Sequence, residues 1–256
     1  MALLEMSKVA TKSPSQKRRR TQHAKIFRLG KLETRRALRI LAILVLGWRS
    51  SLLAHAQLYV GVLGGVSTLS GDARSLVTSG SIAFSSYNPA NGGALGLLAG
   101  RHFSDYFSAQ ASYIWNENGL SLASANSGNV TQEGYQETRT SSQQTVIGNL
   151  LVYFRARDGR LRPYLSVGSG FMHFASTQEN VQQVLGTPAL PQRHFSSNLV
   201  VLNVPVGMDV NLGKGWVFRY TFSETISGNP VSDRLSPTGQ HSFKNFQNLF
   251  GFIRRF

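Results

Sequence analysis

The sequence predicts an all-β protein: an eight-stranded antiparallel up-and-down transmembrane β-barrel, preceded by an N-terminal signal peptide. Three observations indicate this fold class. Apolar and polar residues alternate in short runs after residue 56, the connections between the runs are in turn tight and long, and the chain ends on an aromatic strand. Taken alone, that strand would also fit the edge of a water-soluble sandwich. One of its faces carries four aromatic residues, which is typical of a surface that meets lipid: Phe246, Phe250, Phe252 and Phe256.

The composition favours short strands and removes two classes of site. The chain has 256 residues, 25 glycines and 15 phenylalanines, with no long apolar run after its N-terminal region. Its net charge of +15 comes mostly from the first 56 residues, which hold 13 of the 27 basic and 2 of the 12 acidic residues. The remaining 14 basic and 10 acidic residues form no basic cluster, so we expect no nucleic-acid partner. Without cysteine, the chain has no disulfide framework and no thiolate metal site.

The first part of the chain, residues 1–56, has the organisation of a signal peptide with a long basic n-region. A basic stretch is followed by an apolar core, Ala37–Trp48, and by the small-x-small pattern of Ala54 and Ala56. We therefore expect cleavage before Gln57 and export to the bacterial cell outer membrane. The apolar core is about ten residues long, whereas a transmembrane helix needs about 20, so an anchoring helix is disfavoured.

The second part, residues 57–256, is expected to form the barrel. Tight turns are predicted where Gly, Asp and Ser gather, near residues 104–105, 157–159 and 213–215. Long polar loops are predicted at 70–91, 117–142, 176–197 and 227–242. The strands between these connections number eight, which places both chain ends on the periplasmic side: 58–69, 92–103, 106–116, 143–155, 162–174, 198–212, 216–226 and 244–256.

The hairpin around Lys214 predicts a register as well as two faces. If the turn is centred on Lys214, Asp209 lies opposite Arg219 and both side chains point into the lumen, where they would form an ion pair. The alternative is that Arg219 pairs with Glu224 nearer the loop end. The same register places a set of apolar residues outside: Val204, Val206, Met208, Val210, Trp216, Phe218, Tyr220 and Phe222.

Outward aromatic residues are predicted to face lipid or to form the aromatic girdles at its two boundaries. Strand 106–116 repeats the alternation, and its Trp115 lies near the loop end. The complete predicted set is Trp115, Trp216, Phe218, Tyr220, Phe222, Phe250 and Phe252.

Two further strands add detail to the predicted lumen. Strand 162–174 has an inner face of small residues, Ser166, Gly168 and Gly170, which would make room for larger inward side chains such as Tyr153 or Arg219. Strand 92–103 allows either of its two faces to point inward, and its register stays open.

Three features of the second part resemble the OmpA-type outer-membrane β-barrel domain. They are the run Asn149–Phe154, the run Arg162-Pro163-Tyr164 with the glycines that follow it, and the final strand that ends in Phe256. The likeness covers residues 57–256. It implies a monomer among outer-membrane lipids, delivered by periplasmic chaperones and inserted by a barrel-assembly machinery that recognises Phe256. Arg254 stands where family members have an apolar residue, which is a departure from that signal.

The preferred function is a structural or surface-binding, adhesion-like role through the long extracellular loops, without enzymatic activity. These polar loops are the largest variable feature of the chain. The glycines fall in strands or turns and the six histidines are scattered, so we expect neither a cofactor nor a metal site. A small pore is one alternative, although eight strands enclose an interior that side chains can fill.

The other alternative is a lipid A-modifying barrel enzyme. The run from His194 to Asn198 resembles the His-x-Ser-Asn run of lipid A 3-O-deacylases, which implies His194 as base and Ser196 as nucleophile. An extra serine separates Ser196 from Asn198, and no acidic partner can be assigned, although nucleophilic catalysis needs an oriented base. The pair His241-Ser242 is a weaker match of the same kind.

The predicted architecture has a direct test. The membrane fraction of expressing cells should contain a species whose mobility on gels differs between boiled and unboiled samples, because a closed barrel resists detergent until it is heated. A soluble, helical product whose mobility does not depend on heating would contradict the predicted fold.

Overall fold

The computed structural model describes residues 57–128 and 132–256, and these residues form ten antiparallel strands and one short 3₁₀ turn. The predicted signal peptide, with Ala54 and Ala56, lies outside the described residues, and Gln57 is the first residue of the first strand. No helix in the described ranges is long and apolar enough to cross a membrane.

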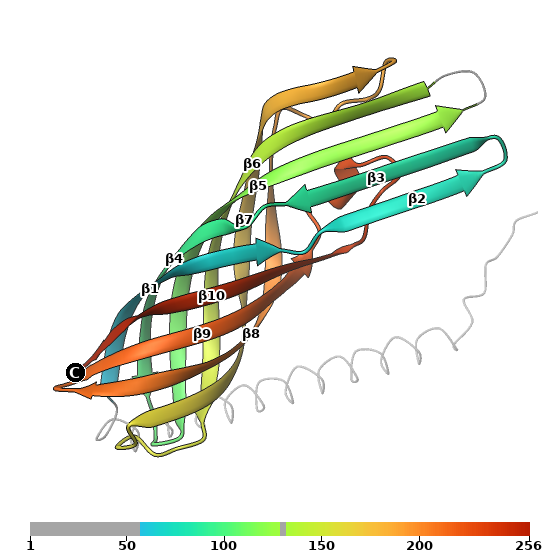
Figure 1. Ribbon diagram of the computed structural model, residues 1–256. Coiled ribbons are helices and arrows are strands. Elements are labelled where there is room, and N and C mark those ends of the chain that lie inside the picture. Colours follow the sequence, from blue (N-terminus) through green and yellow to red (C-terminus); the bar gives the residue numbers. More distant parts are fainter. Residues whose placement is uncertain (1–56, 129–131) are drawn as a thin grey trace, which may run out of the picture. The chain divides into compact units, whose positions relative to one another are not determined.

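Eight of the strands close into a ring, which confirms the predicted fold class (Figure 1). Around the ring the neighbours are β5, β4, β1, β10, β9, β8, β7 and β6, and β6 pairs with β5 again. The first and last strands also meet, because the amide of Phe256 donates to the carbonyl of Leu58 at 2.9 Å. The wall strands are β1 (Gln57–Leu69), β4 (Gly92–His102), β5 (Phe107–Gly128), β6 (Gln132–Tyr153), β7 (Leu161–Leu185), β8 (His194–Gly213), β9 (Trp216–Gly228) and β10 (Ser242–Arg255).

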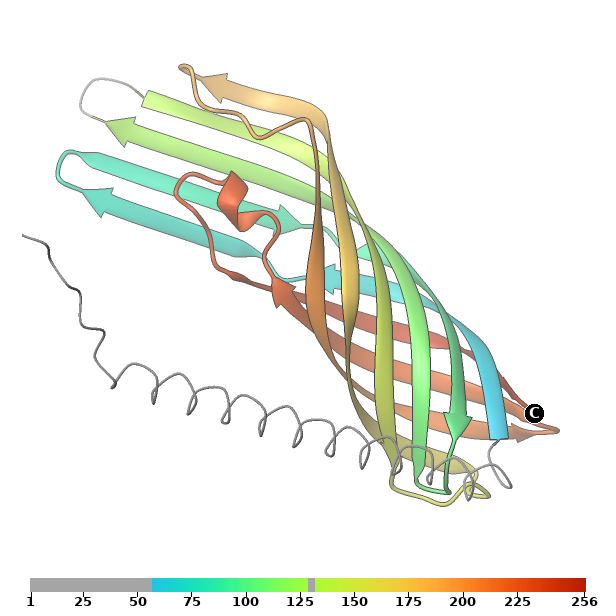
Figure 2. The same ribbon diagram turned by 180° about the vertical axis from the view of Figure 1, so that it is seen from behind.

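Most of the predicted long loops are strands, which corrects the sequence interpretation. Residues 70–91 contain the hairpin of β2 (Asp72–Thr78) and β3 (Ser81–Pro89), and β3 pairs with the far half of β5. The β5–β6 ladder likewise continues to Ser127 opposite Gln132. In these extensions some inward side chains are apolar and buried, as Tyr87, Leu120 and Leu122 are, while polar residues occupy many other positions of the ladder. The alternation is therefore weaker than in the wall. Figure 2 shows the extensions rising together above the ring.

An apolar belt surrounds the ring on its outer side. It ends in a polar row across three neighbouring strands, where Gln144 lies opposite His173, and His173 opposite Asn198. The His173 ring nitrogen and the Asn198 side-chain oxygen are 2.7 Å apart. The upper boundary of the belt is therefore the point at which the outward side chains change from apolar to polar, as expected for a wall that crosses lipid. Exposed members of the belt include Leu58, Val60, Val62, Leu95, Leu97, Phe107, Val146, Leu150, Leu165, Val167, Phe171, Val200, Leu202, Phe250 and Phe252.

The structure resolves the register of the second predicted strand, now β4. Leu95 and Leu97 point outward with 58% and 57% exposure, while His102 is buried inside. Gly100, on the inner parity, leaves room for the ring of Tyr59, which a Cβ at that position would overlap.

The room predicted along strand 162–174 is used differently from the expectation. Gly168 lies against Asn149, and a Cβ there would overlap that amide, so this glycine makes room for neither Tyr153 nor Arg219. Gly207, on the adjacent β8, instead lies against the hydroxyl of Tyr164. The rule of small beside large holds, but the partners differ because strand tilt shifts which side chains meet across the lumen.

The closure between β1 and β10 depends on a close backbone approach that can be tested. A Cβ on Gly251 would overlap the carbonyl of Val62 and lie 2.8 Å from the Cα of Leu63, whereas Gly93 has open space around it. We expect Gly251→Ala to lower the free energy of unfolding by about 1–3 kcal/mol, and Gly93→Ala to change it by less than about 0.5 kcal/mol. Urea unfolding of the protein folded into lipid vesicles measures both. Equal values for the two variants would contradict this account of the closure.

Candidate functional site

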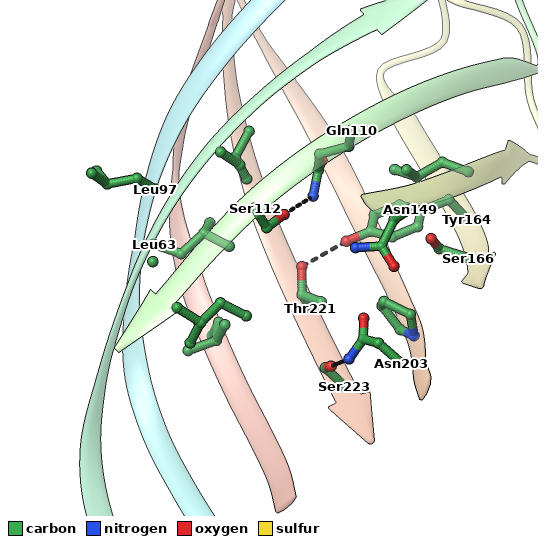
Figure 3. Close-up of a pocket in the computed structure, with 16 residues that line it drawn as sticks. Leu63, Leu97, Gln110, Ser112, Asn149, Tyr164, Ser166, Asn203, Thr221 and Ser223 are labelled. Atoms are coloured by element: carbon green, nitrogen blue, oxygen red, sulfur yellow. Dashed lines mark hydrogen bonds between the residues drawn. The ribbon is translucent and has the colours of Figure 1, made fainter. Parts of the chain in front are cut away.

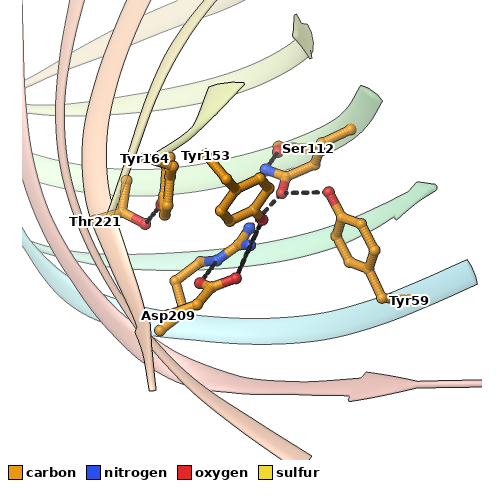
Figure 4. A network of polar contacts seen from close by, with 8 residues as sticks. Tyr59, Ser112, Tyr153, Tyr164, Asp209 and Thr221 are labelled. Carbon is orange, nitrogen blue, oxygen red and sulfur yellow. Dashed lines mark hydrogen bonds and ion pairs between the residues drawn. The ribbon is translucent and has the colours of Figure 1, made fainter. Parts of the chain in front are cut away.

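A charged network fills the lumen near one end of the barrel (Figure 4). This end, called here the closed end, is the one at which the short connections β4–β5, β6–β7 and β8–β9 lie. The Arg219 guanidinium donates to both carboxylate oxygens of Asp209, through Nε at 2.6 Å and Nη2 at 2.7 Å. Its remaining donors reach Gln110 at 2.5 Å and the hydroxyl of Tyr153 at 2.8 Å. Both charged side chains are almost fully buried, at 1% and 2% exposure. This confirms the predicted register about Lys214, in which Asp209 lies opposite Arg219.

The alternative partner of Arg219 is engaged elsewhere. Glu224 forms an ion pair with Lys244 at 3.0 Å on the outer surface, where both side chains are partly exposed. Because Glu224 has the outward parity of β9, its carboxylate is on the opposite face of the strand from Arg219.

Aromatic rings continue the network toward the closed end. The rings of Tyr59, His102, Tyr153 and Tyr164 follow one another with centroids 4.9 to 5.6 Å apart. Arg162 lies over the Tyr153 ring at 3.9 Å and donates to the carbonyl of Asp105 at 2.7 Å. A second cation and a stack of rings therefore close the lumen below the ion pair.

A layer of amides crosses the lumen closer to the opposite end of the barrel, which is called here the mouth. The Gln143 side-chain oxygen accepts from Asn116 at 2.8 Å and from Asn245 at 2.9 Å. Ser67 donates to Asn245 at 2.7 Å, so the layer joins β1, β5, β6 and β10 across the interior. These side chains are buried, and their mutual hydrogen bonds offset the cost of removing them from water.

A small cavity lies between the two layers (Figure 3). Its volume is about 30 Å³, which is room for roughly one or two water molecules. Polar groups from several strands line it, among them Ser112, Asn149, Asn203 and Thr221. The Tyr164 hydroxyl is hydrogen-bonded to Thr221 at 2.6 Å at the edge of this space. The lumen is therefore packed rather than open at this level.

The connection between β9 and β10, residues 229–241, folds across the mouth. It contains the 3₁₀ turn η1 (Ser232–Arg234), and Val231 and Leu235 are buried beneath it. Ser85 donates to the carbonyl of Pro237 at 2.5 Å, and Ser124 donates to that of Ser236 at 2.6 Å. Together with the amide of Gln240, which donates to Asp72, these bonds hold the connection against the inner faces of β2, β3 and β5.

The parts of β2, β3, β5, β6 and β7 beyond the polar row are called here the extension. It contains a second buried ion pair, which sequence reasoning missed. Glu137 and Arg139 are in contact at 2.8 Å with both side chains fully buried. Arg139 also donates to Ser176 and to the carbonyls of Gln192 and Arg193, which ties the β7–β8 connection to β6. The signal in the sequence was a Glu-x-Arg pattern with both charges on the inward parity of β6. It went unused because residues 117–142 were predicted to be a loop.

The predicted lipid-facing residues all point outward from the ring. Trp216, Phe250 and Phe252 are exposed, and rings of β9 and β10 contact one another across the two strands, as in Phe218–Phe252 at 5.7 Å. Trp115 lies opposite Gln144, at the upper end of the apolar belt. Phe256 is 69% exposed at the closed end. That these residues form aromatic girdles stays a prediction, as does the role of Phe256 in barrel assembly.

His194, Ser196 and Asn198 of the deacylase-like run lie on the outer face of β8, at the polar row above the belt, whereas Phe195 and Ser197 have the inward parity. The His194 ring nitrogen contacts the Thr177 hydroxyl at 3.1 Å, and the Asn198 side chain contacts His173. The neighbour of His194 is thus a threonine across the strand pair, so the arrangement does not display the oriented base that an attacking serine requires. His241 is exposed in the mouth connection. Within residues 57–128 and 132–256 no group of three or more His, Cys, Asp or Glu side chains could hold a metal ion.

Comparison with known proteins finds distant structural neighbours only. No family model and no curated protein matches the sequence. Neisserial surface protein A is 13% identical, with 79% of this chain and 99% of that chain covered and a TM-score of 0.45. The attachment invasion locus protein Ail of Yersinia pestis is 11% identical, with 78% and 97% covered and a TM-score of 0.41. The N-terminal β-barrel domain of Pseudomonas aeruginosa OprF is 12% identical, with 79% and 100% covered and a TM-score of 0.39.

The lumen ion pair predicts strong energetic coupling. Because removal of one partner leaves a buried charge, Asp209→Asn and Arg219→Gln should each lower the free energy of unfolding by about 3–5 kcal/mol, and the double variant by clearly less than their sum. Urea unfolding in lipid vesicles gives all four corners of the cycle.

The exposed pair Glu224–Lys244 provides the matched control, since its cycle should show a coupling of less than about 1 kcal/mol. Simple additivity of the Asp209 and Arg219 losses, or equal coupling in both cycles, would contradict the role given to the lumen pair.

Proposed function

We propose that this protein is a monomeric outer-membrane barrel without an open channel, with a structural or surface-binding role carried by its extension. The observation that carries the proposal is the combination of an apolar outer belt with a lumen that is crossed by the Arg219 network and by the amide layer. A wall with outward leucine, valine and phenylalanine requires lipid around it. The buried Asp209–Arg219 pair and the amide layer occupy the interior of a ring of eight strands, which is narrow enough for side chains to fill.

The extension supports a role outside the membrane. Strands β2, β3, β5, β6 and β7 continue beyond the polar row as one sheet, braced by the Glu137–Arg139 pair and by the mouth connection. A rigid, hydrogen-bonded sheet loses little conformational entropy when it binds a partner, which suits a surface-binding function. The proposed partners of the protein during biogenesis are periplasmic chaperones, which would bind the exported residues 57–256, and the barrel-assembly machinery, which would recognise Phe256.

Planar-bilayer recordings combined with lipid A mass spectrometry test this function. The purified barrel should conduct few ions, and expression should leave the acyl chains of lipid A unchanged. Replacing residues 230–240 by a short glycine-serine linker should raise conductance only slightly, because the amide layer and the Arg219 network still fill the lumen.

Two results would contradict the proposal. Large, stable conductance of the unchanged protein would identify a pore. Loss of a lipid A acyl chain that disappears in Ser196→Ala, but persists in the control Ser197→Ala, would identify an enzyme.

A further inference from the structure

The charges of the described residues are unevenly divided between the two ends of the barrel. At the closed end, where Phe256 lies (Figure 1), the acidic residues outside the lumen are Asp105 and Asp158. Asp105 is paired with Arg157 at 3.3 Å. The basic residues of this end, called here the basic collar, are Arg101, Arg155, Arg157, Arg160, Lys214 and Arg254.

The extension and mouth have the opposite balance. Acidic residues outnumber basic ones there, with Glu117, Glu133 and Glu179 among those on or near the surface. The small positive charge of residues 57–256 is therefore concentrated at the end that would contact the inner leaflet. A cationic rim beside an apolar belt attracts anionic headgroups by about 1 kcal/mol per Lys or Arg in favourable cases, which corresponds to about fivefold in binding for each charge.

A groove in the apolar belt begins at this collar. It has a volume of about 760 Å³ on the outer wall of β1, β4, β5 and β6. Its floor follows one row of the sheet, in which Ala99 lies opposite Ala111 and Ala111 opposite Gly148. These small side chains leave a depression that larger neighbours surround.

The rows on either side of this floor follow from the same register. On the mouth side Leu97 lies opposite Tyr113, and Tyr113 opposite Val146. On the closed side the row contains Leu58, Arg101, Ala109 and Leu150. The lining of the groove thus combines apolar side chains such as Leu58, Val60 and Leu150 with Arg101, a half-buried arginine on the lipid-facing parity of β4.

We propose that this groove binds one anionic phospholipid, with an acyl chain along the Ala99–Ala111–Gly148 floor and the phosphate against Arg101 and the basic collar. The inference rests on the proposed membrane location. An apolar trough that leads to a cation at the boundary matches a molecule with an apolar chain and an anionic head.

Native mass spectrometry of the folded barrel with phosphatidylglycerol or phosphatidylcholine of identical acyl chains tests the headgroup contact. We expect the barrel to bind its first phosphatidylglycerol molecule at least about fivefold more tightly than its first phosphatidylcholine molecule. Arg101→Gln should remove most of that preference. The double change Arg155→Gln/Arg160→Gln tests the collar away from the wall and should reduce the preference further at low salt. The control Arg74→Gln removes one positive charge from the extension and should leave the preference intact.

The acyl-chain contact needs a separate pair of variants. Ala111→Phe fills the floor and should weaken the first bound lipid of either headgroup, whereas Gly93→Phe, in open space on β4, should not. Equal binding of the two lipids, an equal effect of Arg74→Gln and Arg101→Gln, or unchanged binding in Ala111→Phe would overturn the inference. Heat-dependent gel mobility is recorded for every sample, so a folded barrel without lipid preference contradicts this site alone and leaves the proposed function standing.

Discussion

The constraint on which the rest of the structure depends is the pairing of every wall strand on both sides. In an apolar surrounding an unpaired backbone amide or carbonyl has no water to bond, so a sheet can remain there only if it closes. The ring is closed by the pairing of its first strand, β1, with its last strand, β10. Once the ring is closed, period-two alternation divides each strand into a lipid-facing and a lumen-facing set, and the two sets meet different physical demands.

The lumen-facing set must fill a narrow interior that water cannot solvate well. It does so in layers, with the Asp209–Arg219 pair and aromatic rings near one end and the Asn116–Gln143–Asn245 amides toward the other. Each layer joins strands that are not neighbours in the wall, so the interior braces the ring across its diameter. Such buried polar groups are stable only as a set, because the loss of one leaves the others without partners.

The sequence was sufficient for the wall and insufficient for the extension. Outward residues such as Phe218 and Phe252 belong to strands with strong alternation. Pairing residues at equal distances before and after Lys214 predicted the contact between Asp209 and Arg219. Above the polar row only some inward side chains, such as Leu120 and Leu122, are apolar and buried, and polar residues occupy many other positions. The alternation is therefore weak, and β2, β3 and the far half of β5 were predicted to be loops. Contacts across the lumen, such as Gln110 with Arg219, were equally hidden, since they depend on strand tilt and not on spacing along the chain.

The anchoring of the mouth connection has a consequence for how the exposed surface can diversify. Ser85 and Ser124 bond carbonyl oxygens of the connection, and Asp72 accepts from one of its amides, so its position is held largely through main-chain atoms. Main-chain groups are present whatever side chains accompany them. Exposed residues such as Asp233 and Thr238 can therefore be exchanged without releasing the cover of the barrel, so the sequence of this connection can vary at little cost in folding.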